Sequence, residues 1–114
     1  MKRVPRTSGA YRSMWLFAMF DLPMTSPAKR RAYAQFRKLL LKNGFCRMQY
    51  SVYARYYKDE ASSLPIRHLI RAKLPKEGQV RLLMVTDGQF GRQQVFQGKK
   101  GLRNYLIWQS ATVA

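Results

Sequence analysis

Acidic residues are scarce in this chain of 114 residues. Five Asp and Glu stand against 22 Lys and Arg, which gives a formal net charge of +17. Such an imbalance creates self-repulsion that a protein without a polyanionic partner has no evident reason to carry. Nucleic acid is the leading partner class, because a duplex has one negative charge per about 1.7 Å and releases counterions when Lys and Arg approach.

Long apolar runs are absent as well. The longest unbroken one, from Met14 to Phe20, is too short to cross a bilayer. Asp21 and Pro23 cut it short and no small-residue cleavage site follows, so it does not have the form of a secretory signal. We therefore expect a cytoplasmic protein without a membrane partner.

Cysteine and histidine occur once each, as Cys46 and His68. One cysteine excludes an intrachain disulfide and fits a reducing cytoplasm, and the pair supplies too few ligands for a zinc site. We expect Cys46 to be a small buried hydrophobic residue rather than a nucleophile, because His68 lies on a different predicted element. His68 itself is expected at the surface.

Local patterns predict two helices and four strands, followed by a further extended piece. The run at 14–20 indicates a strand buried on both faces, because it is apolar throughout. In chain order, the expected elements are a strand at 14–20, a helix from 27 to about 43, strands at 45–48 and 51–57, a helix opening at 59–65 and ending before Pro75, a strand at 80–86, and an extended piece at 94–98.

This order predicts an α+β, ferredoxin-like βαββαβ fold, in which an antiparallel sheet carries both helices on one face. We assign residues 1–13 to a flexible basic arm and residues 14–98 to the folded domain. Residues 99–114 form a C-terminal extension that adds an extra strand or pairs with a partner protomer or subunit.

One face of such a sheet is left bare, and two coverings fit it. Exposed aromatic residues can stack on single-stranded bases, as in RNA-recognition modules, or a second copy can pack against the sheet. The basic and glycine-rich string of the RNA-recognition module is absent from Gln49 to Arg55. Aliphatic residues are mixed with the aromatics, so we predict a sheet-to-sheet homodimer.

Basic residues gather on the outer sides of both predicted helices. No acidic residue lies between Asp21 and Asp59, which favours ligand binding over a merely solvated face. The residues predicted to bind nucleic acid are Lys29, Arg30, Arg31, Arg37, Lys38, Lys42, Arg67 and Arg71.

Asp21 is the only carboxylate before Asp59, and its spacing leaves two interpretations open. It either forms a turn before Leu22 and Pro23 or acts as a metal ligand at the edge of the sheet. Two-metal hydrolysis needs a denser carboxylate cluster. The other carboxylates lie on other predicted elements, without a spacing that gathers them; they are Asp59, Glu60, Glu77 and Asp87.

Several segments, taken in order from about residue 14 to 98, resemble the second CRISPR-associated protein family (Cas-two), in the version found beside single-protein effector systems of the Cas-nine type. The segment Gln49-Tyr50-Ser51-Val52-Tyr53 is the most specific of them. The full set is Phe20-Asp21-Leu22-Pro23, Lys29-Arg30-Arg31, Phe36-Arg37-Lys38-Leu39-Leu40, Asn43-Gly44-Phe45, Gln49-Tyr50-Ser51-Val52-Tyr53-Ala54-Arg55, Val80-Arg81-Leu82-Leu83-Met84-Val85-Thr86-Asp87, Gln89-Phe90-Gly91 and Phe96-Gln97-Gly98.

The resemblance implies a homodimer that bridges two dimers of the CRISPR integrase subunit and holds a short DNA duplex, the prespacer, during spacer acquisition. The effector nuclease of the same system is a further implied partner. The resemblance also implies a Mg²⁺ site at Asp21, shared across the dimer, with Asp21 as the catalytic residue of a metal-dependent endonuclease on RNA or DNA. That activity, close to the toxin ribonucleases that share this fold, is the alternative function. A ribosome-associated basic protein is a third and weaker reading.

Overall fold

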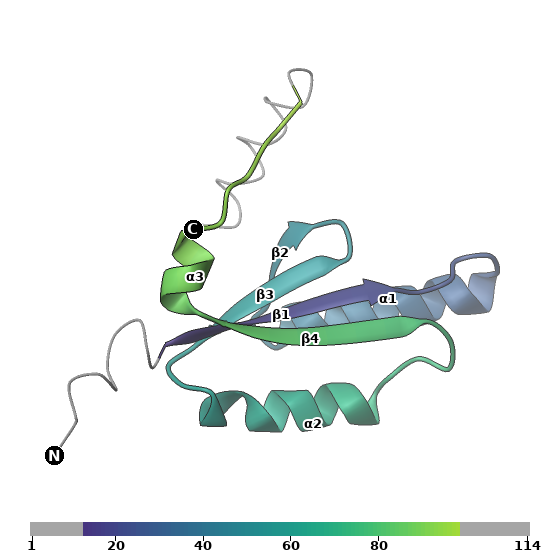
Figure 1. The fold of residues 1–114 in the computed structure, drawn as a ribbon. Coiled ribbons are helices and arrows are strands. Elements are labelled where there is room, and N and C mark those ends of the chain that lie inside the picture. Colours follow the sequence, from purple (N-terminus) through teal and green to yellow (C-terminus); the bar gives the residue numbers. More distant parts are fainter. Residues whose placement is uncertain (1–12, 99–114) are drawn as a thin grey trace, which may run out of the picture.

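The structure, a computed structural model, describes residues 13–98 and consists of one antiparallel sheet with helices beside it (Figure 1). The strand order in the sheet is β2-β3-β1-β4, which confirms the predicted ferredoxin-like arrangement. The predicted arm at 1–13, except for its last residue, and the extension at 99–114 lie outside the described residues. The elements are β1 (Met14–Asp21), α1 (Pro27–Lys42), β2 (Cys46–Gln49), β3 (Val52–Tyr57), a 3-10 turn (Ala61–Ser63), α2 (Leu64–Ala72), β4 (Gln79–Thr86) and α3 (Asp87–Gly91).

Helices α1 and α2 cover the same face of the sheet. Alternate β1 side chains point toward them, and the aromatic ring of Phe20 packs edge-on against Phe36 of α1, with ring centroids 5.1 Å apart. Burying these apolar surfaces together is the main favourable term in folding. The buried cluster comprises Leu16, Ala18, Phe20, Leu22, Tyr33, Phe36, Leu40, Phe45, Tyr53, Tyr57, Ile66 and Ile70. Among residues 13–98, no helix has both the length and the apolar character that a bilayer span needs.

The opposite face of the sheet, called here the open face, is only partly covered within one chain. The alternate β1 residues Trp15, Phe17 and Met19 are half-buried there, so burial of β1 on both sides stays a prediction that depends on the predicted second copy. Side chains of directly paired residues share a face of an antiparallel sheet. The paired residues that complete the open face are Val52, Ala54 and Tyr56 on β3 and Arg81, Leu83 and Val85 on β4.

Helix α3 lies over one end of the open face, and the sequence did not predict it. The ring of Phe90 stacks on Trp15 at a centroid distance of 3.9 Å, and the indole Nε1 of Trp15 donates a hydrogen bond to Asp87 at 2.7 Å. Thr86 and Gln89 form a reciprocal capping box that starts the helix. The extended piece predicted at 94–98 is not a strand in the structure.

Cys46 is exposed, so the prediction of a buried cysteine is wrong. It pairs with Ala54 of β3, and this register places its side chain on the open face. β2 is an edge strand, so the side chain has a neighbouring strand on one side only. His68 is exposed, as predicted.

Gly78 controls how the start of β4 approaches the end of β1. Its φ is +99°, and an added Cβ would lie 2.7 Å from both the carbonyl oxygen of Asp21 and the Leu22 side chain. We expect Gly78→Ala to lower the free energy of unfolding by about 2 kcal/mol or more, because strain and a backbone clash add together. Urea unfolding measures this loss. Gly98→Ala is the control, since its Cβ would meet nothing within 4 Å, and equal stability losses in the two variants would contradict the prediction.

Candidate nucleic-acid surface and carboxylate site

Helix α1 presents most of the predicted cationic residues to solvent. It begins after Ser26, whose hydroxyl accepts a hydrogen bond from the backbone nitrogen of Lys29 at 3.2 Å, and Pro27 occupies its first turn. Tyr33, Phe36 and Leu40 point into the core, which turns the opposite side outward. The exposed basic residues on that side, called here the α1 cationic face, are Arg30, Arg31, Arg37, Lys38 and Lys42.

No acidic residue occurs within α1, so nothing on the helix neutralises this face. Arg37 and Lys38 follow Arg30 and Arg31 by seven residues, about two helical turns, and Lys42 follows Lys38 by four, so the side chains align along the helix. Clustered Lys and Arg on one surface raise the local electrostatic potential and attract polyanions. The α1 cationic face is therefore suited to a row of phosphate groups.

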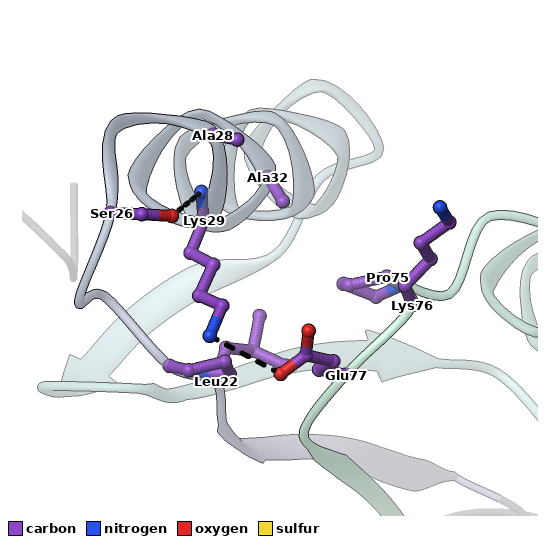
Figure 2. Close-up of a pocket in the computed structure, with 9 residues that line it drawn as sticks. Leu22, Ser26, Ala28, Lys29, Ala32, Pro75, Lys76 and Glu77 are labelled. Carbon is purple, nitrogen blue, oxygen red and sulfur yellow. Dashed lines mark hydrogen bonds and ion pairs between the residues drawn. The ribbon is translucent and has the colours of Figure 1, made fainter.

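Lys29 belongs to the predicted set but has a different environment. Its Nζ lies 3.4 Å from a carboxylate oxygen of Glu77, across a hollow of about 260 Å³ between the start of α1 and the loop before β4 (Figure 2). Leu22 and Pro75 contribute apolar walls to this hollow. Lys29 thus connects the start of α1 to the loop before β4 and offers less free charge to a ligand than its neighbours on α1.

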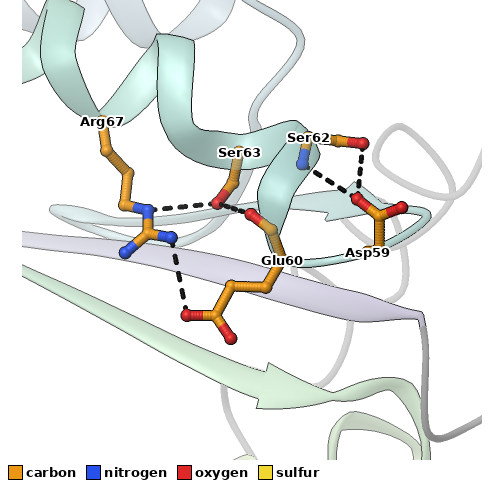
Figure 3. A network of polar contacts seen from close by, with 5 residues as sticks. All are labelled: Asp59, Glu60, Ser62, Ser63 and Arg67. Carbon is orange, nitrogen blue, oxygen red and sulfur yellow. Dashed lines mark hydrogen bonds and ion pairs between the residues drawn. The ribbon is translucent and has the colours of Figure 1, made fainter.

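Arg67 on α2 is likewise engaged within the protein. Its Nε donates a hydrogen bond to Ser63 at 3.1 Å, and its Nη2 lies 3.6 Å from Glu60 (Figure 3). Ser63 also donates to the backbone carbonyl of Glu60 at 2.7 Å, so the guanidinium helps to hold the start of the helix. Arg71, in the last turn of α2, is exposed. The eight predicted residues therefore do not form one uniform surface.

Asp21 differs from the other carboxylates of the chain. It is the last residue of β1, is exposed, pairs with Gln79 of β4, and follows Met19 on the open-face side. All five carboxylates lie within residues 13–98, and among these described residues Asp21 is the one whose side chain makes no hydrogen bond or ion pair. The others are engaged: Asp59 with Ser62, Glu60 with Arg67, Glu77 with Lys29, and Asp87 with Trp15.

The donor set at Asp21 is too small for a metal site within one chain. Residues 13–98 contain no group of three or more His, Cys, Asp or Glu side chains that could hold an ion. Mg²⁺ in proteins usually takes one or two carboxylates together with water and phosphate oxygens. One copy supplies one free carboxylate, so a site here needs a second copy or a bound phosphate.

Comparison with known proteins decides the family. A sequence model described as "CRISPR associated protein Cas2" matches residues 14–93. This range includes every described strand and helix, from β1 to α3. The chain belongs to the Cas2 family. The matched region contains Asp21, the α1 cationic face and both basic positions on α2.

Curated Cas2 proteins align with most of this chain at 38% to 50% identity. The protein from Parvibaculum lavamentivorans is 50% identical over 88 residues, which cover 76% of this chain and 86% of the relative. Those from Flavobacterium psychrophilum and Lacticaseibacillus rhamnosus are 38% and 39% identical, covering 79% and 80% of this chain and 78% and 92% of the relatives. Each of the three is named a CRISPR-associated endoribonuclease Cas2. This Cas2-family chain is accordingly a CRISPR-related protein.

Two features of this Cas2-family structure, the contacts of Arg55 and the tip of the β2–β3 hairpin, were not among the sites predicted from the sequence. Arg55 donates from Nη1 to the backbone carbonyl of Asn43 at 2.8 Å and lies 4.4 Å from the ring centroid of Tyr57. Burial raises the pKa of Tyr57, and the positive charge of Arg55 partly opposes that rise. Arg55, which is not among the predicted binding residues, therefore stabilises the end of α1.

The second feature is the tip of the β2–β3 hairpin, where Tyr50 is 63% exposed and Ser51 has a φ of 62°. The sequence predicted a tight link at Gln49 and Tyr50, one residue earlier than the observed turn. The only local signals in the sequence for a binding role at this hairpin tip were the tyrosine itself and a nearby basic residue, Arg47.

Proposed function

We propose that this protein is an architectural subunit of the CRISPR adaptation complex, in which it holds duplex DNA and bridges dimers of the integrase subunit in the cytoplasm. The observation that carries the proposal is the α1 cationic face, five exposed basic residues on a helix without an acidic one. Membership of the Cas2 family supports the CRISPR context. The overall charge of +17 supports a polyanionic partner.

Helix α1 favours binding through phosphates rather than through base edges. Its exposed Lys and Arg side chains form a surface row, and phosphate contacts of this kind fix position on a duplex without reading its sequence. An integrating complex must accept fragments of any sequence, so sequence-blind binding suits the proposed role.

The open face supports a homodimer in which two sheets pack together. Tyr56 and Leu83 are 47% and 51% exposed there, and the rings of Trp15 and Phe17 are only half-buried. A twofold interface uses the same patch on both copies, and burying apolar surface drives such association. Two copies would also present two α1 cationic faces to one duplex.

Salt dependence of duplex binding tests the proposal. If a dimer neutralises about six to ten phosphates, the logarithm of the association constant should fall with the logarithm of salt concentration at a slope of about −5 to −9. Fluorescence anisotropy with several duplexes of equal length and different sequence measures the slope. A slope near zero, or a strong preference for one sequence, would contradict the proposal. Co-purification with a neighbouring integrase subunit is the complementary test.

A second candidate function is that of a metal-dependent endonuclease on RNA or DNA. The observation that favours it is the free carboxylate of Asp21 at the end of β1, together with the endoribonuclease names of the relatives. In this proposal Asp21 of each copy would hold one weakly bound Mg²⁺ shared across the dimer. Magnesium would supply charge stabilisation at a phosphate, and Asp21 would be its protein ligand.

A further inference from the structure

The tip of the β2–β3 hairpin, formed by Tyr50 and Ser51, exposes a large aromatic ring on an ordered part of the chain. Tyr50 is 63% exposed, although an aromatic ring is among the side chains that gain most from burial. The ring is not part of the buried core cluster. Neither the phosphate-binding role of α1 nor the carboxylate of Asp21 accounts for it.

The backbone of the hairpin tip is strained and held in place. Ser51 has a φ of 62°, in the left-handed region that residues other than glycine seldom adopt. Its carbonyl accepts a hydrogen bond from the backbone nitrogen of Phe20 at 3.1 Å, and its hydroxyl shares a hydrogen bond with the Tyr33 hydroxyl at 2.9 Å. Strained residues persist where surrounding contacts over-determine them, and they cluster at functional sites.

The orientation of the Tyr50 ring is also fixed before any ligand binds. Its ring lies 5.9 Å from that of Tyr33 at an interplanar angle of 21°, and its hydroxyl donates to the sulfur of Met24 at 3.4 Å. The neighbouring Tyr33 hydroxyl raises the pKa of Tyr50 above its ordinary value of 10.0, and a phenol is neutral at physiological pH even without this rise. A neutral ring does not repel phosphate.

One guanidinium group lies over this ring, and a second contacts the same Met24 as the Tyr50 hydroxyl. The Cζ of Arg47 lies 5.7 Å from the centroid of Tyr50. Arg30, a member of the α1 cationic face, donates from Nη1 to the carbonyl of Met24 at 3.1 Å, and Met24 is the residue that accepts the Tyr50 hydroxyl. Aromatic rings interleaved with cations are the combination that binds single-stranded nucleic acid, because the cations meet the backbone and the rings stack on bases.

The hairpin tip lies at the same end of the sheet as the free carboxylate. The hydrogen bond from Phe20 to Ser51 joins the residues that directly adjoin Asp21 and Tyr50 in the chain. The Tyr50 ring packs against Tyr33 of α1, and Asp21 lies on the open-face side, so a strand that wraps around this end of the sheet from the helix side to the open face would meet both side chains. Inside a duplex the neighbouring base pairs cover both faces of each base, so an internal base offers its face to the ring only when it is unpaired.

We propose that Tyr50 is a stacking platform for an unpaired nucleobase and positions a single-stranded segment of nucleic acid at the end of the sheet that carries Asp21. The inference rests on the proposed nucleic-acid-binding function and adds a subsite with its own chemistry. Phosphates bind the α1 cationic face, and a base plane binds the hairpin tip.

The test compares single-stranded and duplex oligonucleotides of equal length, as DNA and as RNA, with wild type, Tyr50→Ala and Tyr50→Phe. Tyr50→Ala should weaken single-strand binding about 5- to 100-fold, because stacking on one base is lost, and leave duplex binding unchanged. The salt slope should stay the same, because the ring carries no charge. Tyr50→Phe should bind like wild type, and a 2-aminopurine probe in the single strand should lose its quenching in Tyr50→Ala but keep it in Tyr50→Phe.

Leu41→Ala is the matched control, since Leu41 is an apolar residue on α1 that is 45% exposed. Tyr50→Leu keeps apolar bulk without a planar ring and should bind like Tyr50→Ala, and urea midpoints check that all variants fold. Wild-type single-strand affinity in Tyr50→Ala, or equal losses in Tyr50→Phe, would overturn the inference alone. A wild-type protein that binds no nucleic acid would overturn the proposed function as well, and this result is visible without any variant.

Discussion

Replacing Arg31 and Lys38 together by Glu is expected to weaken duplex binding at least about 100-fold at roughly 0.1 M salt, for every sequence alike. Both residues are exposed on the α1 cationic face, so their loss should not disturb the core. A dimer would lose four phosphate contacts, and the salt slope should become shallower by about four. Fluorescence anisotropy over a salt series measures both quantities.

The matched control is Lys58→Glu with Lys73→Glu. Both lysines are exposed and lie outside α1, so this variant has the same net charge as the first. We expect it to lose much less affinity, because only long-range attraction is reduced. Equal losses in the two variants would mean that net charge alone, and not the α1 cationic face, determines binding. A loss confined to one DNA sequence would also contradict the account.

The main elements of the fold were predictable because their signals are local. Ser26 and Pro27 mark the start of α1 and Gly44, with a φ of +87°, follows its end, all within a few residues of the helix. The apolar run from Met14 fixes β1 in the same way, by its composition. The order of such elements then leaves few topologies, and the ferredoxin-like one was confirmed.

The errors concern features that depend on register and on distant contacts. The four residues of β2 do not determine which face Cys46 occupies, and the pairing with Ala54 does. The open face is only half-covered because α3 reaches one end of it, through the stacking of Phe90 on Trp15. The sequence did contain the capping signal at Thr86 that starts α3, but it directly follows a strand.

In the candidate site, too, features with local signals could be predicted, and features that depend on distant contacts could not. Exposure of Arg31, Arg37 and Lys38 follows from helical spacing, so it could be predicted. The ion pair between Lys29 and Glu77 joins residues far apart in the sequence, so no local sequence pattern predicts it. The strained turn at the hairpin tip was equally hidden, because Ser51 is not the glycine or asparagine that usually marks a positive φ.

Asp21→Asn is expected to abolish any nuclease activity, with a loss of at least about 100-fold, because the amide keeps the shape of the side chain but removes the charge that Mg²⁺ needs. Asp21 is exposed at the end of β1 and makes no contact within the described residues that the change would break. Dimerisation and duplex affinity should therefore stay within about twofold of wild type. Glu60→Gln, another exposed carboxylate-to-amide change, should leave cleavage unchanged. Cleavage of labelled RNA and DNA in Mg²⁺ measures the difference, and full activity in Asp21→Asn would remove this residue from any catalytic role.

Spacer integration by the reconstituted complex is the most direct test of the architectural role. The assay combines the integrase subunit, a prespacer duplex and a repeat array with wild type, Asp21→Asn, or the Arg31→Glu and Lys38→Glu variant, at matched dimer concentration. The account predicts near-normal integration with Asp21→Asn and little or none with the charge-reversed variant. An Asp21→Asn protein that folds, dimerises and binds duplex yet fails to support integration would contradict the account.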